Sequence, residues 1–164
     1  MKVTLRPAEQ ADFDFCFHAK RDAIRPHIAS RWGWDEDFQL RFHRQRWSEK
    51  PWFIIVAEAQ AVGTVSIQWS DTHLQFGEFY LLGAFQRRGI GTRVLQSVLQ
   101  EADAKRLPAK LEYLKWNPVG SLYKRHGFIV IEETEIHYLL VRQPVSPNPS
   151  VKGTGLRPAP YVER

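Results

Sequence analysis

The chain contains a single cysteine, Cys16, among 164 residues. One thiol cannot form an intramolecular disulfide or a cysteine-based zinc site, so the fold must depend on a hydrophobic core. A chain of this length buries roughly 70% of its unfolded surface, which is enough for one such core. The six histidines show no spacing typical of metal ligands, and we predict no metal.

Long apolar runs are also missing. The run at residues 53–57 is short, whereas a membrane helix needs about 20 apolar residues. The first residues, Met-Lys-Val-Thr-Leu-Arg-Pro, carry no apolar stretch behind their charges. We therefore predict no membrane helix and no signal peptide, and we expect a cytoplasmic protein.

Proline is scarce in the body of the chain and concentrated at its end. Five of the ten prolines lie after residue 143, among several glycines and serines. Such a composition disfavours both helices and central strands. We predict one domain over residues 1–143 and a Pro/Gly-rich C-terminal extension over residues 144–164.

Positive charge exceeds negative charge. Lys and Arg number 23 and Asp and Glu 18, for a formal net charge of +5. This balance permits an anionic partner such as nucleic acid or a phosphorylated cofactor but does not choose between them.

The periodicity of apolar residues predicts an α/β fold with a mixed, mostly antiparallel sheet of six or seven strands and about four helices. The predicted strands cover residues 3–7, 52–58, 62–69, 74–82, 111–116, 128–131 and 136–141. The predicted helices cover residues 8–22, a stretch capped by Asp35, residues 90–106, and a short stretch from Asn117-Pro118 to Gly127. The only predicted parallel crossover spans residues 74–116.

The most informative segment is Gln86-Arg87-Arg88-Gly89-Ile90-Gly91, between a predicted strand and a predicted helix. Glycines let a backbone approach a ligand closely, and the N–H groups of a first helical turn attract anions. Arg87, Arg88 and Arg93 add positive charge at the same end. A pyrophosphate is the group that such a loop suits; a tight, basic helix start without a ligand is the alternative.

Two common phosphate loops do not fit this segment. A P-loop requires Gly-Lys-Ser/Thr, which does not follow, and the dinucleotide fingerprint requires a third glycine where Val94 stands. The segment instead resembles the Gln/Arg-x-x-Gly-x-Gly/Ala signature of the GNAT superfamily of N-acetyltransferases. The resemblance extends from about residue 3 to 142 and includes Leu111-Glu112, Asn117, and the run from Tyr123 to Gly127-Phe128.

The resemblance implies a single GNAT-like domain whose sheet is splayed at the central strands, and acetyl-CoA or coenzyme A as co-substrate. It places the pantetheine arm on the backbone of the strand before the loop, the pyrophosphate on the loop, and Asn117 on the far side. The implied cofactor-binding residues are Phe79, Tyr80, Leu81, Gln86, Arg87, Arg88, Gly89, Ile90, Gly91, Thr92, Asn117 and Tyr123.

Three residues are candidates for catalysis. Tyr123 is the predicted general acid, because a phenol with pKa about 10 can protonate a departing thiolate whose pKa is about 8.5; alternatively its ring packs on the sheet. Glu112 and Glu78 are candidate general bases, ranked in that order, and each could equally be a solvated or ion-paired carboxylate. A backbone N–H near Leu81 would stabilise the oxyanion.

The acceptor side is the least defined. Trp32, Trp34, Asp35 and Glu36 combine indoles with carboxylates, which suits a cationic amine. The alternative is that Asp35 caps a helix and Glu36 complements its dipole. The acceptor's identity is open, and the resemblance implies a homodimer as one possible assembly.

The sequence thus predicts an acetyl-CoA-dependent N-acetyltransferase acting on a primary amine of a small molecule or of a peptide or protein N-terminus. Alternatives are an acyltransferase using another acyl-CoA, or a non-catalytic CoA-binding or nucleic-acid-binding domain of the same fold. Nucleic acid is disfavoured because the arginines concentrate in one loop rather than along a helix face.

Overall fold

The computed structural model describes residues 1–146, so the predicted extension lies outside the described residues except for 144–146. One sheet contains β1 (Val3–Pro7), β2 (Trp52–Ala57), β3 (Gln60–Trp69), β4 (Leu74–Leu81), β5 (Ala109–Leu114), β6 (Ile129–Glu133) and β7 (His137–Arg142). The helices of this part are α1 (Phe13–Trp32), α2 (Glu36–Glu49), α3 (Ile90–Ala104) and α4 (Gly120–Arg125), with 3₁₀ turns η1 (Gln10–Asp12) and η2 (Gly83–Phe85).

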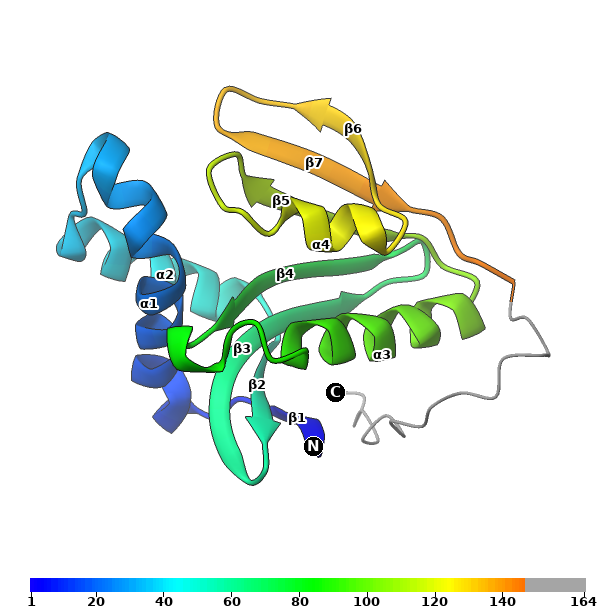
Figure 1. The fold of residues 1–164 in the computed structure, drawn as a ribbon, viewed down its shortest axis with the longest axis horizontal. Helices are drawn as coiled ribbons and strands as arrows, with labels where there is room; N and C mark the ends of the chain where they lie inside the picture. The colour runs from blue at the N-terminus through cyan, green and yellow to red at the C-terminus, as the bar shows by residue number, and fades with distance from the viewer. Residues whose placement is uncertain (147–164) are drawn as a thin grey trace.

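The strand order in the sheet is β1-β2-β3-β4-β5-β7-β6. All neighbouring strands pair antiparallel except β4 and β5, which are parallel and are joined through α3 (Figure 1). The predicted mixed sheet, with its crossover at residues 74–116, is confirmed.

The two faces of the sheet are covered by different helices. On one face, α3 and α4 bury an apolar cluster that includes Val94, Leu95 and Tyr123. On the other face, α1 packs over β3 and β4, and a second cluster holds Cys16, Trp52 and Ile54. The strand β4 therefore lies between α1 on one face of the sheet and the layer of α3 and α4 on the other.

Two helices differ from their predicted bounds. The first begins at Phe13, after the turn η1, rather than at residue 8. It continues ten residues beyond the predicted end at 22, through Pro26 to Trp32, because Ile24 and Ile28 are both buried and their packing offsets the hydrogen bond that proline cannot make. The last begins at Gly120 rather than at Asn117, whose Oδ1 instead accepts the Val119 N–H at 3.2 Å in a turn before the helix.

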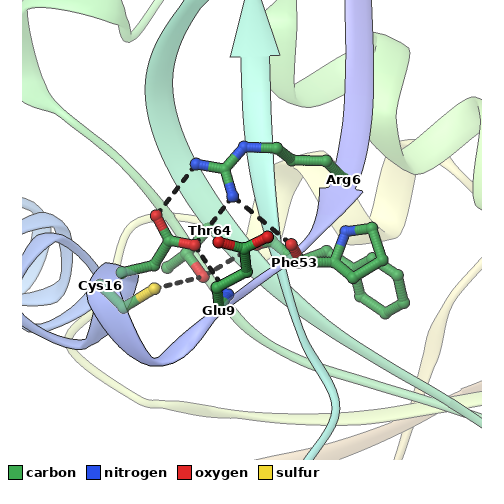
Figure 2. Close-up of polar contacts among 7 residues, drawn as sticks. Arg6, Glu9, Cys16, Phe53 and Thr64 are labelled. Carbon is green, nitrogen blue, oxygen red and sulfur yellow. Dashed lines mark hydrogen bonds and ion pairs between the residues drawn. The ribbon is translucent and has the colours of Figure 1, made fainter.

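A buried polar contact connects α1 to the sheet (Figure 2). The Cys16 thiol donates to Thr64 Oγ1 at 3.5 Å, and the Thr64 hydroxyl donates to the Phe53 carbonyl at 3.0 Å. Burial raises the pKa of Cys16 to about 11, so the thiol stays protonated at neutral pH. Cys16 is core, as predicted, and it holds the adjoining turn of α1 against β3.

His43, in α2, predicts a pH-dependent stability. Its side chain is fully buried; one ring nitrogen lies 3.2 Å from the Phe13 carbonyl and the other has no partner. Burial lowers the pKa of His43 below its usual value of 6.5. The unfolded chain therefore binds the proton more readily, so the contribution of His43 to stability is complete above pH 6.5 and is lost as the pH falls below it.

We expect the free energy of unfolding to decrease between pH 7 and pH 5, by about 1.4 kcal/mol for each unit of pKa lowering. Denaturant titrations at both pH values measure it. His43→Phe removes the titrating group among aromatic neighbours and should reduce this decrease; an identical pH dependence in that variant would contradict the assignment.

Candidate active site

The strands β4 and β5 are paired for only two positions, Leu74 with Ala109 and Gln75 with Lys110. Beyond them, β5 continues beside β7 and β4 continues beside β3, and the two strands diverge (Figure 1). Within residues 1–146, the β5-facing edge of β4 from Phe76 to Leu81 therefore has no neighbouring strand. An extended ligand can bind such an edge with its own amides.

The divergence coincides with a β-bulge. Gly77 pairs with Ser66 and Tyr80 with Thr64, so Glu78 and Phe79 together oppose one residue of β3. Glu78 has φ +45°, which is uncommon for a residue with a Cβ. A bulge bends its strand and redirects a side chain, and this one bends β4 where the sheet opens. The sequence carries no signal for it other than the preceding glycine.

The loop after β4 leads into an α-helix whose N-terminus no side chain caps. Gly89 is the N-cap residue, with φ +79°. Arg87 and Arg88 are exposed and form no ion pair within the described part of the chain. The N–H groups of the first turn and two unpaired guanidinium groups thus lie together, as an anion site requires. Arg93, the third predicted cation at this end, donates from Nη1 to the Met1 carbonyl at 2.6 Å.

The two glycines of the motif have different roles. A Cβ on Gly89 would meet no atom within 4 Å, so the position is open and only its backbone conformation requires glycine. A Cβ on Gly91 would lie 3.4 Å from Phe79 Cζ and 3.6 Å from Leu81 Cδ1. A Cβ at Gly91 would therefore make ordinary van der Waals contact with these two β4 side chains, whereas a Cβ at Gly89 would enter open space.

Two side chains connect the loop to its surroundings. Gln86 Nε2 donates to the Leu81 carbonyl at 2.9 Å, and Asp22 Oδ2 accepts the Gly83 N–H at 2.6 Å. The first residue of the motif thus holds the loop at the end of β4, and α1 holds its beginning. The role of Asp22 had no signal in the sequence, because the contact joins residues 61 positions apart.

Tyr123 is 4% exposed and lies on the α3 and α4 side of the sheet. Its ring centroid is 5.7 Å from that of Tyr113, 5.7 Å from that of Phe128 and 6.4 Å from that of Phe76. Burial raises the pKa of Tyr123, so the phenol is protonated at neutral pH, as a general acid must be. A packing role would show the same contacts, and catalysis by Tyr123 stays a prediction.

The two candidate bases have different surroundings. The Glu78 side chain is 7% exposed; its Oε1 lies 3.3 Å from Lys50 Nζ and its Oε2 is buried without a partner. Glu112 is exposed on β5 and forms no ion pair within residues 1–146. Burial raises the pKa of Tyr80, and the charge of the Glu78 carboxylate and a hydrogen bond to it raise it further, so the Tyr80 hydroxyl lies beside Glu78. Because its unpartnered oxygen lies at the bulge, the geometry favours Glu78 over Glu112.

The four residues predicted to bind the acceptor contact different partners. Asp35 Oδ1 accepts the Phe38 N–H at 3.0 Å, which confirms the predicted cap of α2. Glu36 accepts from Trp34 Nε1 at 2.6 Å and from Arg21 Nη1 at 2.5 Å, and these contacts lower its pKa. Trp32 lies elsewhere, with its ring centroid 4.2 Å from that of Trp116.

This arrangement favours structural roles for both acidic residues. We expect Asp35→Ala to lower the free energy of unfolding by about 1 kcal/mol, because a helix N-terminus loses its side-chain acceptor.

Glu36→Gln should leave the Michaelis constant of an amine acceptor unchanged at low and high salt, since Arg21 already compensates the carboxylate. Denaturant titration and steady-state kinetics measure the two effects. A raised constant with a weaker salt dependence in Glu36→Gln would restore the predicted pocket.

Comparison with protein families matches residues 49–130 to the acetyltransferase (GNAT) domain. The match spans half of the chain, and the protein belongs to this family of acetyltransferases. No curated protein matches the sequence.

Solved structures with the same fold are distant in sequence. The PaiA N-acetyltransferase from Thermoplasma acidophilum, in complex with coenzyme A, is similar with a TM-score of 0.69 and 16% identity over 87% of this chain and 99% of that one. The ribosomal-protein-S18-alanine N-acetyltransferase from Escherichia coli gives a TM-score of 0.63 and 14% identity over 92% and 99%. Ard1 from Thermoplasma volcanium gives 0.63 and 17% over 89% and 100%.

These comparisons confirm the predicted single GNAT fold with its open central sheet. Among the residues that the structure describes, no helix is long and apolar enough to cross a membrane. The same residues contain no group of three or more His, Cys, Asp or Glu side chains that could hold a metal ion.

Proposed function

We propose that the protein transfers an acetyl group from acetyl-CoA directly to a primary amine of a small molecule or of a peptide or protein N-terminus. The observation that carries this proposal is the unpaired edge of β4 beside the uncapped N-terminus of α3. Family membership supports acyl transfer; the acetyl group and the amine acceptor belong to the proposal.

The residues present fit coenzyme A. The backbone of Phe79, Tyr80 and Leu81 lies on the strand edge that β5 leaves, where amide groups can bind the pantetheine arm. The N–H groups of residues 87–92, together with Arg87 and Arg88, supply donors and positive charge for the pyrophosphate. Asn117 follows β5 and would contact the arm from the opposite strand.

Acetyl-CoA supplies an activated thioester carbonyl, and residues of the chain move the protons. Glu78, through its unpartnered Oε2, would accept a proton from the attacking amine. A backbone N–H near Leu81 would donate to the carbonyl oxygen as it gains charge. Tyr123 would donate its phenolic proton to the sulfur as the C–S bond breaks.

Two measurements test the proposal. Coenzyme A should raise the melting temperature, whereas an oligonucleotide of equal charge should not. Release of free thiol from acetyl-CoA should then depend on an added amine, in a panel of amino acids, polyamines, aminoglycosides and N-terminal peptides. Stabilisation by the oligonucleotide alone would favour a nucleic-acid-binding domain. Faster thiol release with a longer acyl-CoA would favour another donor.

A further inference from the structure

We propose that Lys20 and Arg46 form a binding site for a carboxylate of the acceptor, so that the preferred acceptor is an amino acid rather than a simple amine. The proposal rests on the proposed function, whose amine would meet Glu78 in the same place. Its basis is the buried ammonium group of Lys20, which lacks a hydrogen bond or ion pair within residues 1–146 and lies on the face of the sheet that α1 covers.

Lys20 is the first observation. It lies in the middle of α1, is 4% exposed, and forms no hydrogen bond or ion pair with any residue of the described part, 1–146. Its Nζ lies 4.8 Å from the centre of the Phe42 ring. A buried ammonium group without a partner costs stability, and lysines this deeply buried are almost always paired.

The neighbours of Lys20 also have unused polar atoms. The Arg46 guanidinium lies on the same Phe42 ring, 4.7 Å from its centre, and its buried Nε has no hydrogen-bond partner. The Glu78 Oε2 atom is also buried without a close partner, although Lys50 and the Tyr80 hydroxyl lie against the same carboxylate. An amino acid could satisfy these groups, because its carboxylate would accept from Lys20 and Arg46 and its amine would donate to Glu78.

The carboxylates near Lys20 are already paired with other cations and do not compensate its charge. Lys50 is 3.3 Å from Glu78, and Glu49, 45% exposed, is 3.8 Å from Arg46. Three cations therefore face two carboxylates, and His43 is neutral and packed among aromatic rings. Burial lowers the pKa of Lys20; Glu78 opposes this, and Arg46 and Lys50 add to it.

The position relative to the open sheet identifies the ligand as the acceptor. Glu78 lies at the bulge where β4 has already left β5, on the side covered by α1 and α2. At the start of α2, Glu36 is engaged with Arg21 and Asp35 with the helix backbone. Asp37 is exposed in the first turn, where it complements the helix dipole. The available charge beside the candidate base is therefore positive, which favours an acidic group on the acceptor.

The experiment compares amino acids with their carboxamides, using thiol release from acetyl-CoA by the full-length chain. In the wild type, kcat/KM for the best amino acid should exceed that for its amide by at least about 10-fold, as for a charge-assisted hydrogen bond. Lys20→Met should bring this ratio close to one, and Lys20→Arg should retain most of it. Lys105→Met, which removes the same charge at the far end of α3, should leave it unchanged.

Stability supplies an independent readout. Lys20 has no hydrogen bond or ion pair within residues 1–146 to lose, and the cost of burying its charge exceeds its attraction to the Phe42 ring and to Glu78. Lys20→Met should therefore raise the melting temperature by about 2–4 °C. A lower melting temperature would assign Lys20 a structural role and overturn the proposal, as would equal rates with amino acids and amides. If no amine in the panel releases thiol, the proposed function itself is wrong. If amines are acetylated equally well with and without a carboxylate, the proposed function stands and only the carboxylate site is wrong.

Discussion

Replacing Tyr123 by phenylalanine should lower the turnover number by about 100-fold while leaving the affinity for coenzyme A unchanged. The substitution removes one hydroxyl from a ring that is 4% exposed, so the packing against Phe76, Tyr113 and Phe128 remains. The effect arises because the sulfur would then leave as a thiolate without a proton donor. Turnover is measured by thiol release and affinity by calorimetry.

A matched variant removes the same group elsewhere. Tyr138→Phe deletes a hydroxyl on β7, whose ring centroid is 5.6 Å from that of Tyr113, and should keep normal turnover. A thioester with a poorer leaving group should widen the deficit of Tyr123→Phe, because the missing proton then matters more. Normal turnover in Tyr123→Phe would leave Tyr123 only a packing role.

Replacing Gly89 by valine should reduce the affinity for coenzyme A by roughly 10- to 100-fold, with the domain still folded. Gly89 has φ +79°, a conformation that costs most L-residues about 1–2 kcal/mol and a β-branched one more. The loop would relax to another conformation and move the N–H groups of the first turn of α3. A factor of ten in affinity corresponds to about 1.4 kcal/mol.

Gly33→Val is the matched control. Gly33 has φ +71° and open space around it, like Gly89, but it follows α1 rather than the loop. Gly33 has ψ −179°, a region that is almost exclusive to glycine, whereas Gly89 has ψ 2°. Gly33→Val should therefore lose at least as much stability as Gly89→Val, and only Gly89→Val should lose affinity for coenzyme A. Gly91 is unsuitable for this test because its Cβ would face Phe79 and Leu81. Wild-type affinity in a folded Gly89→Val protein would remove the loop from the binding site.

Local patterns were enough to predict most elements. The helix α3 was predicted because Val94, Leu95, Val98 and Leu99 recur at helical spacing, and all four are buried. The loop was recognised because its glycines and arginines are consecutive in the sequence. The end of α1 was missed because Pro26 is locally unfavourable in a helix, and only the burial of Ile24 and Ile28 explains why the helix continues.

The contacts of the site residues were likewise predictable only where the partner is close in the sequence. Asp35 was predicted as a helix cap because the N–H that it accepts lies three residues away. The partners of Glu36, Glu78 and Arg93 were not predictable, because Arg21, Lys50 and Met1 lie 15, 28 and 92 positions away. Gly91 belongs to the motif, but the direction of its missing Cβ depends on how α3 packs on β4.

The sequence by itself determined the order of the elements, the glycine loop at the start of α3 and the resemblance to an acetyltransferase family, since each is written in neighbouring residues. Tertiary structure alone decided where β4 leaves β5, because a bulge depends on the register between two strands. It also decided which carboxylate lies at that opening with one buried oxygen that Lys50 does not reach, and which lysine is buried beside it. Charges act through space, and only the packing of α1 and α2 on the sheet brings Lys20, Arg46 and Glu78 together.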